Sequence, residues 1–377
     1  KETAEGYVLD GEIREIDLTY VDQDTSEVTW SGDWQNNRQK VEVTVLKKEK
    51  DSDRVLEGAV FALAAKEDIT NKDGDVILEA GTVIEEKATD EDGKLTFEAD
   101  LPIGFSYTVK ETSPAPGFAT TDEIQEFTFT AESSEKATVF YEFTFEDEPT
   151  VFEFTKTSLT TGEEIEGAKL TVTDENGKVV DEWVSGKEPH IIKELVVGQT
   201  YTMTEILPAL GYVTAESIRF TVEDTAEVQK IEMKDDVTKV EISKTDIAGE
   251  ELPGAKLTIL DENGEVVESW TSTEEPHYIE MLPIGKYTLH EEAAPEGYLV
   301  AEDVAFEVKD TSEIQKVVMK DEAEPEETPK TPETSTTTVD MPKTGDSTPI
   351  AALMISCVLG LAGTIAAAVR MKMRKKK

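Results

Sequence analysis

The sequence predicts an all-β chain of tandem β-sandwich domains arranged in a rod, followed by a disordered linker and a C-terminal transmembrane helix. Three observations support this prediction: a repeat of 86–88 residues, short runs of alternating apolar and polar residues, and an uncharged run of 20 residues close to the C-terminus. The length of 377 residues leaves room for two to four domains.

The repeat covers most of the chain. Two copies align without gaps over their characteristic phrases: Lys156-Thr157 with Lys244-Thr245, Tyr201–Glu205 with Tyr287–Glu291, and Met233-Lys234-Asp235 with Met319-Lys320-Asp321. A third, longer copy precedes them and contains Leu56–Ala59, Tyr107–Glu111 and Phe143–Asp147. An insertion around residues 66–90 accounts for its greater length.

Each copy has the pattern of an antiparallel β-sandwich. Its apolar positions alternate with polar ones, and Asn176-Gly177 and Asn263-Gly264 suit two-residue hairpin turns. No copy has a convincing amphipathic helix. The links between copies, Asp147 to Lys156 and Asp235 to Lys244, are short, and short links favour a stiff rod.

These features divide the chain into six segments. The opening phrase Lys1–Tyr7 resembles phrases found inside the later copies, so residues 1–39 are interpreted as the C-terminal part of a preceding repeat. The predicted domains are 40–149 (with the insertion), 150–237 and 238–323; residues 324–340 form a linker rich in Pro, Thr and Glu, and 341–377 form a C-terminal signal with a transmembrane segment at 350–369.

Composition excludes several classes of function. The formal net charge of −45 argues against DNA or RNA as a partner, because phosphate binding needs a basic surface. A single cysteine, Cys357, excludes an intramolecular disulfide and a CxxC metal or redox site. We expect no metal, no cofactor and no enzyme activity on other molecules. Acid pairs such as Asp73 and Asp75 are better explained by hairpin turns than by Ca²⁺ or glycosidase sites, and His190 and His277 are interpreted as turn residues.

One lysine, one glutamate and one aspartate in each copy continue an apolar series that faces inward. Residues two apart in a strand face the same side, so Val240, Ile242 and Lys244 share a face. A single such charge is readily explained as a strand end that reaches solvent, but the recurrence of all three favours a buried site. The members are Lys47, Glu111 and Asp147; Lys156, Glu205 and Asp235; and Lys244, Glu291 and Asp321. In the first copy Lys48 competes with Lys47, which better keeps the inward register.

Burial of these three side chains would favour a reaction between them. Burying a lone ion costs several kcal/mol, so the three groups must pair or become neutral. A neutral amine beside a protonated carboxylic acid is a nucleophile beside an acyl centre, and a second carboxyl can move protons between them. The product is a Lys–Asp amide and one water.

The phrases Ser243–Asp246, Glu291–Tyr298 and Met319–Asp321 resemble Cna protein B-type (SpaA-like) domains of Gram-positive adhesin stalks and pilins. The resemblance spans about residues 40–323. It implies an Ig-like or prealbumin-like sandwich fold and autocatalytic isopeptide bonds, with Lys47 joined to Asp147, Lys156 to Asp235 and Lys244 to Asp321. The catalytic acids would be Glu111, Glu205 and Glu291. Pro208 stands one place earlier than the family's Pro-x-Gly-Tyr phrase, and Asp replaces the more frequent Asn acceptor.

The C-terminus carries a second resemblance. Ile350 to Val369 has no charge, and six of the last eight residues are basic, so a simple membrane anchor that leaves residues 1–349 outside is one interpretation. Upstream, Met341, Pro342, Lys343, Thr344 and Gly345 resemble the LPXTG sorting signal, with Met in place of Leu. This resemblance implies that sortase cuts Thr344–Gly345 and joins the threonine to peptidoglycan or to another pilin subunit.

We therefore expect a secreted structural stalk or pilin-like protein, anchored to the Gram-positive cell wall and inserted in the membrane before sortase cleavage. The alternative is an adhesin that binds a host extracellular-matrix protein or glycan, either through these domains or through a missing N-terminal region. The polar stretch Lys66–Thr82 has no aromatic residue and offers that alternative little support.

Overall fold

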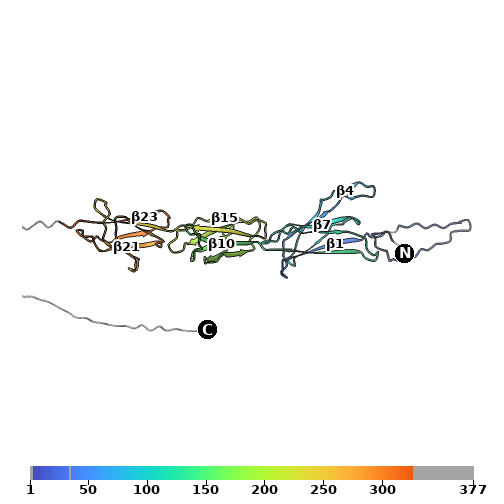
Figure 1. The fold of residues 1–377 in the computed structure, drawn as a ribbon. Helices are drawn as coiled ribbons and strands as arrows, with labels where there is room; N and C mark the ends of the chain where they lie inside the picture. Colours follow the sequence, from blue (N-terminus) through green and yellow to red (C-terminus); the bar gives the residue numbers. More distant parts are fainter. Residues whose placement is uncertain (1–2, 34, 326–377) are drawn as a thin grey trace, which may run out of the picture. The chain divides into compact units, whose positions relative to one another are not determined.

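The structure is a computed structural model that describes residues 3–33 and 35–325, and every regular element in these residues is a β-strand. The predicted all-β class is confirmed, and the strands form three successive sandwich domains (Figure 1). Most of the predicted linker and the whole of segment 341–377, including Met341–Gly345 and the span 350–369, lie outside the described residues. Among the residues that are described, no helix is long and apolar enough to cross a membrane.

The first domain packs a three-stranded sheet against a four-stranded sheet. The first sheet has the order β6-β1-β9, and the second has the order β5-β2-β7-β8. The bounds are β1 Lys40–Glu49, β2 Val60–Ala65, β5 Val83–Ala88, β6 Lys94–Phe97, β7 Ser106–Ser113, β8 Ile124–Thr128 and β9 Thr138–Asp147. The insertion adds a small hairpin, β3 (Ile69–Thr70) and β4 (Val76–Leu78), which projects from the domain in Figure 1.

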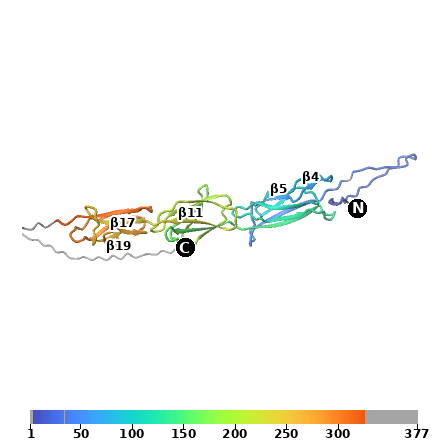
Figure 2. The same ribbon diagram turned by 45° about the horizontal axis from the view of Figure 1, so that its top comes forward.

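The second and third domains repeat this plan without the hairpin. Their sheets have the orders β13-β10-β16 with β12-β11-β14-β15, and β20-β17-β23 with β19-β18-β21-β22; Figure 2 labels β17 and β19, one strand from each sheet of the third domain. The bounds in the second domain are β10 Val151–Ser158, β11 Lys169–Thr173, β12 Val179–Val184, β13 His190–Lys193, β14 Thr200–Leu207, β15 Ile218–Thr221 and β16 Val228–Asp235. Those in the third are β17 Lys239–Asp246, β18 Lys256–Leu260, β19 Val266–Thr271, β20 His277–Glu280, β21 Gly285–Ala293, β22 Val304–Val308 and β23 Ile314–Asp321.

One part of the sequence prediction was wrong: the sandwiches are not purely antiparallel. In each domain the first and last strands pair in parallel, β1 with β9, β10 with β16 and β17 with β23. A parallel pair needs a long connection between its strands, and here the rest of the domain supplies it. Because the two strands run the same way, the chain enters a domain at one end and leaves it at the other.

Each domain buries its own apolar core between its sheets. Phe61, Tyr107 and Phe145 lie in the first core, Phe154, Met203 and Met233 in the second, and Ile242, Leu289 and Met319 in the third. Residues 3–39 form no strand among those described; the chain runs out from Tyr7 and returns to Arg38, where the two residues form a β-bridge (Figure 1).

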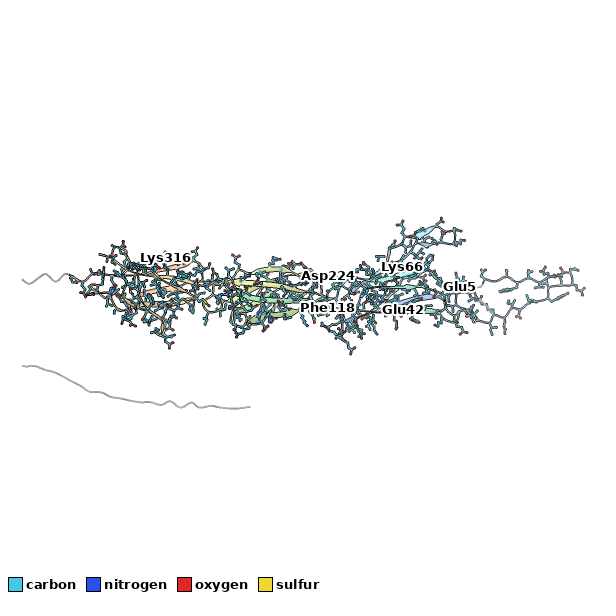
Figure 3. All side chains as sticks on the ribbon, in the orientation of Figure 1. Glu5, Glu42, Lys66, Phe118, Asp224 and Lys316 are labelled. Atoms are coloured by element: carbon cyan, nitrogen blue, oxygen red, sulfur yellow. The ribbon has the colours of Figure 1, made fainter. Side chains whose placement is uncertain are left out.

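Consecutive domains meet through a loop that follows β7 and β14. Gly117 and Gly211 have positive φ, and their carbonyls accept the N–H groups of Thr150 and Thr238. The Thr150 hydroxyl also donates to the Leu195 carbonyl at 2.6 Å, and the Thr238 hydroxyl donates to that of Leu282 at 2.6 Å. Figure 3 labels Phe118 and Asp224 in the region where the first and second domains meet.

Candidate functional site

Each domain holds one buried lysine on its first strand. Lys47, Lys156 and Lys244 lie on β1, β10 and β17, and their side chains are at most 1% exposed. They are buried because alternate residues of these strands face the core. The competing Lys48 points the other way, with a side chain that is 27% exposed and 3.8 Å from Asp53.

The last strand brings an aspartate to each lysine. In the parallel register Lys47 is opposite Phe145, so Asp147 is two residues further along and faces the same side. The same offset places Asp235 relative to Lys156 and Asp321 relative to Lys244. The lysine Nζ contacts the aspartate Oδ1 directly in all three domains.

The glutamate comes from the opposite sheet, at a β-bulge. Glu111, Glu205 and Glu291 lie on β7, β14 and β21, and the register with the neighbouring strand shifts beside each of them. A bulge turns a side chain away from the regular pleat and is often found beside reactive sites. The glutamate Oε1 lies 3.0, 3.1 and 2.9 Å from the lysine Nζ in the first, second and third domains.

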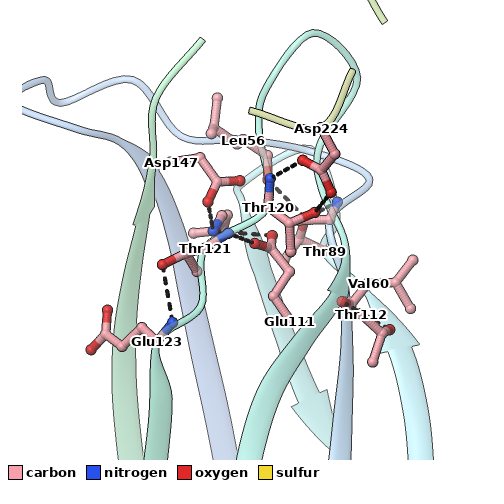
Figure 4. A network of polar contacts seen from close by, with 12 residues as sticks. Leu56, Val60, Thr89, Glu111, Thr112, Thr120, Thr121, Glu123, Asp147 and Asp224 are labelled. Atoms are coloured by element: carbon pink, nitrogen blue, oxygen red, sulfur yellow. Dashed lines mark hydrogen bonds and ion pairs between the residues drawn. The ribbon is translucent and has the colours of Figure 1, made fainter. Parts of the chain in front are cut away.

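A backbone amide fixes the other glutamate oxygen. The N–H groups of Thr121, Ala215 and Ala301 donate to Oε2 at 2.8, 2.7 and 2.6 Å. Figure 4 shows the first of these contacts, between Thr121 and Glu111. In each described site the glutamate Oε1 faces the lysine Nζ as an ion pair without the geometry of a hydrogen bond, and the aspartate Oδ2 has no hydrogen-bond partner. Two carboxyl groups with oxygens that lack a hydrogen bond in one buried site are best satisfied when they share a proton.

Burial raises the pKa of Glu111 and of the aspartate in each trio. Loss of solvent raises the pKa of Glu111 to about 7 and that of Asp235 to about 7, against the opposing effect of the adjacent lysine. Burial likewise raises the pKa of Asp147 and Asp321 above the ordinary range. Near neutral pH the carboxyl pairs of the first and second domains therefore retain a proton, and the lysine faces an acid that can be attacked rather than two carboxylates.

The described site is chemically self-contained. It offers an amine, a carboxyl carbon that an amine can attack, and a second carboxyl group that can transfer protons, all within contact distance and closed to bulk solvent. The described residues hold no group of three or more His, Cys, Asp or Glu side chains that is arranged to bind a metal ion.

Sequence reasoning missed the bulge and the backbone donors, because neither has a residue signature of its own. The signal that was available is the fixed ten-residue step from each glutamate to its donor, Thr121, Ala215 or Ala301. The interpretation of the Pro-His residues as turns was wrong. His190 and His277 begin β13 and β20 and stack on Trp183 and Trp270, with ring centroids 4.3 and 4.4 Å apart.

The fold and the repeated site define a class of protein built from tandem prealbumin-like sandwiches. The chain belongs to the SpaA family of prealbumin-like fold domains, which matches residues 41–142, 150–237 and 238–323. This result supports the SpaA-like part of the resemblance that the sequence suggested.

Several solved structures are similar to this chain. The Bacillus anthracis TIE protein is 26% identical over 76% of this chain and 52% of its own, with a TM-score of 0.41, so this chain spans about half of that one. BcpA, the major pilin subunit of Bacillus cereus, is 15% identical over 76% of this chain and 100% of its own, with a TM-score of 0.34. A streptococcal ancillary pilin is 15% identical over 74% of this chain and 99% of its own, with a TM-score of 0.28. No curated protein matches the chain.

Proposed function

We propose that this chain is a structural stalk or pilin-like protein of the Gram-positive cell surface whose three domains cross-link themselves through Lys–Asp isopeptide bonds. The observation that carries the proposal is the threefold recurrence of a buried lysine in contact with a buried aspartate and a buried glutamate. A surface pair would be explained as ordinary solvation, but three fully buried trios are costly unless they react or share protons.

The proposed reaction begins with a proton transfer inside the trio. In the first domain, the Lys47 ammonium gives a proton to the Asp147 carboxylate, which leaves a neutral amine beside two carboxylic acids, because burial raises the pKa of Glu111 to about 7. The amine nitrogen attacks the Asp147 carbonyl carbon, and Glu111 takes a proton from the nitrogen as it gives its own to the departing hydroxyl. One amide and one water form, and Glu111 ends protonated as it began.

The cross-link suits a load-bearing protein. It joins the first and last strands of each domain, where a pulling force along the chain enters and leaves. The bond closes separations of 100, 79 and 77 residues in the first, second and third domains. In the chain-entropy model, closing loops of this size stabilises a domain by about 4–5 kcal/mol.

The mass of the intact chain tests the chemistry. We expect the purified protein to be three waters lighter than its sequence mass. Glu111→Ala, Glu205→Ala and Glu291→Ala should each restore one water, and peptide mapping should locate the restored water in the altered domain. Gln at the same three positions provides a second set that preserves side-chain volume.

Glu292→Ala is the matched control, because Glu292 follows Glu291 on β21 but points outward, where it accepts a hydrogen bond from Thr258. It should keep all three losses of water. A wild-type chain of full sequence mass would refute the proposal.

We also propose, from the sequence of residues 341–377, that sortase attaches the chain through Thr344 to peptidoglycan or to another pilin subunit. Incubation with a purified sortase and an amine acceptor should give a product that ends in Thr344 joined to that amine. Thr344→Ala should abolish the product, whereas cleavage at any other bond would contradict the assignment.

A further inference from the structure

The segment that positions each glutamate is also the segment that contacts the next domain. Thr121 donates its N–H to Glu111, and its neighbour Thr120 donates both its N–H and its hydroxyl to the carboxylate of Asp224 in the second domain, at 2.8 and 2.7 Å (Figure 4). A shallow hollow beside this contact is lined by Thr120, Thr121 and Asp147 together with Ala226 of the second domain.

The second domain repeats the arrangement with a weaker contact. Ala215 donates to Glu205, and the adjacent Thr214 donates its N–H to Asp310 of the third domain at 2.8 Å. In the third domain Ala301 donates to Glu291, but none of the described residues accepts from the N–H of the adjacent Val300. The contact from the following domain is thus weaker for the second domain than for the first.

A side-chain contact within the same domain also holds this segment, and it is present in the third and second domains but not among the described residues of the first. In the third domain His290, next to Glu291, contacts Asp303 at 2.7 Å and so fastens the segment to β21. The second domain has the corresponding hydroxyl pair Thr204–Ser217 at 2.9 Å. The first domain has Lys110 and Glu123 at these positions, and within the described part of the chain these two side chains form no hydrogen bond or ion pair with each other.

We propose that Asp224 of the second domain is a positioning residue for cross-linking in the first domain, because it holds the segment that presents the Thr121 N–H to Glu111. This inference rests on the proposed cross-linking function. Asp310 acts in the same way on the second domain, where the Thr204–Ser217 pair shares the task. The first domain therefore cross-links efficiently only after the second domain has folded against it.

The time course of cross-linking tests this proposal in the full-length chain. Chains made by cell-free synthesis are denatured at set times, digested, and assayed for the cross-linked peptide of each domain. Asp224→Ala should slow the first domain by about fivefold to tenfold, as expected when one or two hydrogen bonds no longer hold a segment. It should leave the third domain unchanged.

A conservative substitution at position 224 distinguishes a loss of positioning from a general loss of stability. Asn at position 224 can accept from the Thr120 N–H and donate to its hydroxyl, so Asp224→Asn should restore the rate to within about twofold of wild type. Glu223→Ala, an exposed neighbour on the same turn, is the matched control and should have no effect. Equal slowing of all three domains by Asp224→Ala would overturn the proposal.

If the bond forms too fast for a time course, hydrogen exchange can test the role of Asp224 in a variant that cannot cross-link its first domain. In a Lys47→Met background, Asp224→Ala should accelerate hydrogen exchange at the Thr121 amide and leave the Ala301 amide unchanged. Unchanged exchange at Thr121, or unchanged kinetics in the first domain, overturns the role of Asp224 alone. A wild-type chain that loses no water in any domain overturns the cross-linking function itself.

Discussion

The first and third domains hold the same three ionisable side chains between different apolar walls. Opposite the lysine in the parallel register stands Phe145 in the first domain and Met319 in the third. Opposite the glutamate stands Phe61 in the first and Leu257 in the third. The distance from lysine Nζ to glutamate Oε1 is nevertheless 3.0 Å in one and 2.9 Å in the other.

The backbone, and not the identity of the apolar wall, therefore specifies the site. The parallel pairing of first and last strands sets the spacing of lysine and aspartate, and the bulge aims the glutamate. The wall needs only to be apolar, although an aromatic wall adds one contact in the first domain, where the Lys47 Nζ lies 5.4 Å from the centre of the Phe61 ring.

The largest expected effect is on extension under force. With the bond in place, the residues between Lys47 and Asp147, or between Lys244 and Asp321, cannot be pulled out. Single-molecule stretching of Lys47→Met should add an unfolding step in which the 100-residue separation contributes about 350 Å, at about 3.5 Å per residue. In Lys244→Met the 77-residue separation should contribute about 270 Å.

The two lengths identify which domain has opened, and the wild-type chain should show neither step. A replacement outside the trio, Lys48→Met, serves as the control for the first domain. An unfolding step of this full length in the wild-type chain would show that the proposed bond has not formed in that domain.

A second effect concerns pH. The proposed cross-linking needs the proton that the buried carboxyl pair holds, so the rate of water loss should fall as that proton leaves. Burial raises the pKa of Glu111 to about 7, so cross-linking in the first domain should slow by about tenfold per pH unit above about pH 7. Below this pH the rate should level off.

The second domain should follow the same profile, because burial raises the pKa of Asp235 to about 7. The measurement is the time course of cross-linked peptide in newly made chains at several pH values. A rate that rises steadily through neutrality would instead mean that loss of the lysine proton limits the reaction, and would contradict a shared proton.

Much of this architecture could be predicted from the sequence, for identifiable physical reasons. The alternation that places Lys244 on the face of Val240 and Ile242 is a local property of a strand, so the inward direction of the lysines could be predicted. One inward-facing lysine is weak evidence for a buried site, but its recurrence at the same position in all three copies made the prediction stronger. The parallel pairing of β17 with β23 could not be predicted in this way, because alternation is the same in parallel and antiparallel strands.

The bulges, the amide donors and the contacts between domains were also missed. A bulge at Glu111 depends on how β2 and β7 pair, and the contact from Thr120 to Asp224 joins residues 104 positions apart. Such features depend on tertiary packing, and neither local propensity nor spacing carries them.

A smaller effect on stability is expected from replacing glycines, and it should differ between Gly117, which lies at a domain contact, and Gly297, which has open space around it. Gly117 and Gly297 have φ of +90° and +88°, so alanine should cost about 1–2 kcal/mol of domain stability at either position. At Gly117 an added Cβ would also lie 2.8 Å from the Glu194 carbonyl oxygen of the second domain, whereas at Gly297 it would meet nothing within 4 Å.

Gly117→Ala should therefore also loosen the contact between domains, measured as faster hydrogen exchange at the Thr150 amide, which donates to the Gly117 carbonyl at 3.0 Å. Gly297→Ala should lower the stability of the third domain without this second effect. Equal exchange at Thr150 in wild type and Gly117→Ala would mean that the loop adapts to the added carbon.

The smallest expected effect is the salt dependence of the first domain contact, which has an ion pair that the described residues of the second contact lack. Arg54 makes a bidentate ion pair with Glu194, with N–O distances of 2.6 and 2.9 Å, across the first contact. Met281 takes the place of Glu194 at the second contact, where it has the same φ of 63° and its N–H donates to Thr238 as that of Glu194 donates to Thr150.

Both ion-pair partners are partly exposed, so a double-mutant cycle of Arg54→Ala and Glu194→Ala should give a coupling of about 0.5–1 kcal/mol. Solvent ions screen such a pair, so the coupling should vanish in about 1 M salt, while the second contact keeps its amide protection at Thr238 under the same conditions. A salt response at Thr238 as large as that at Thr150 would mean that charges other than Arg54 and Glu194 govern both contacts.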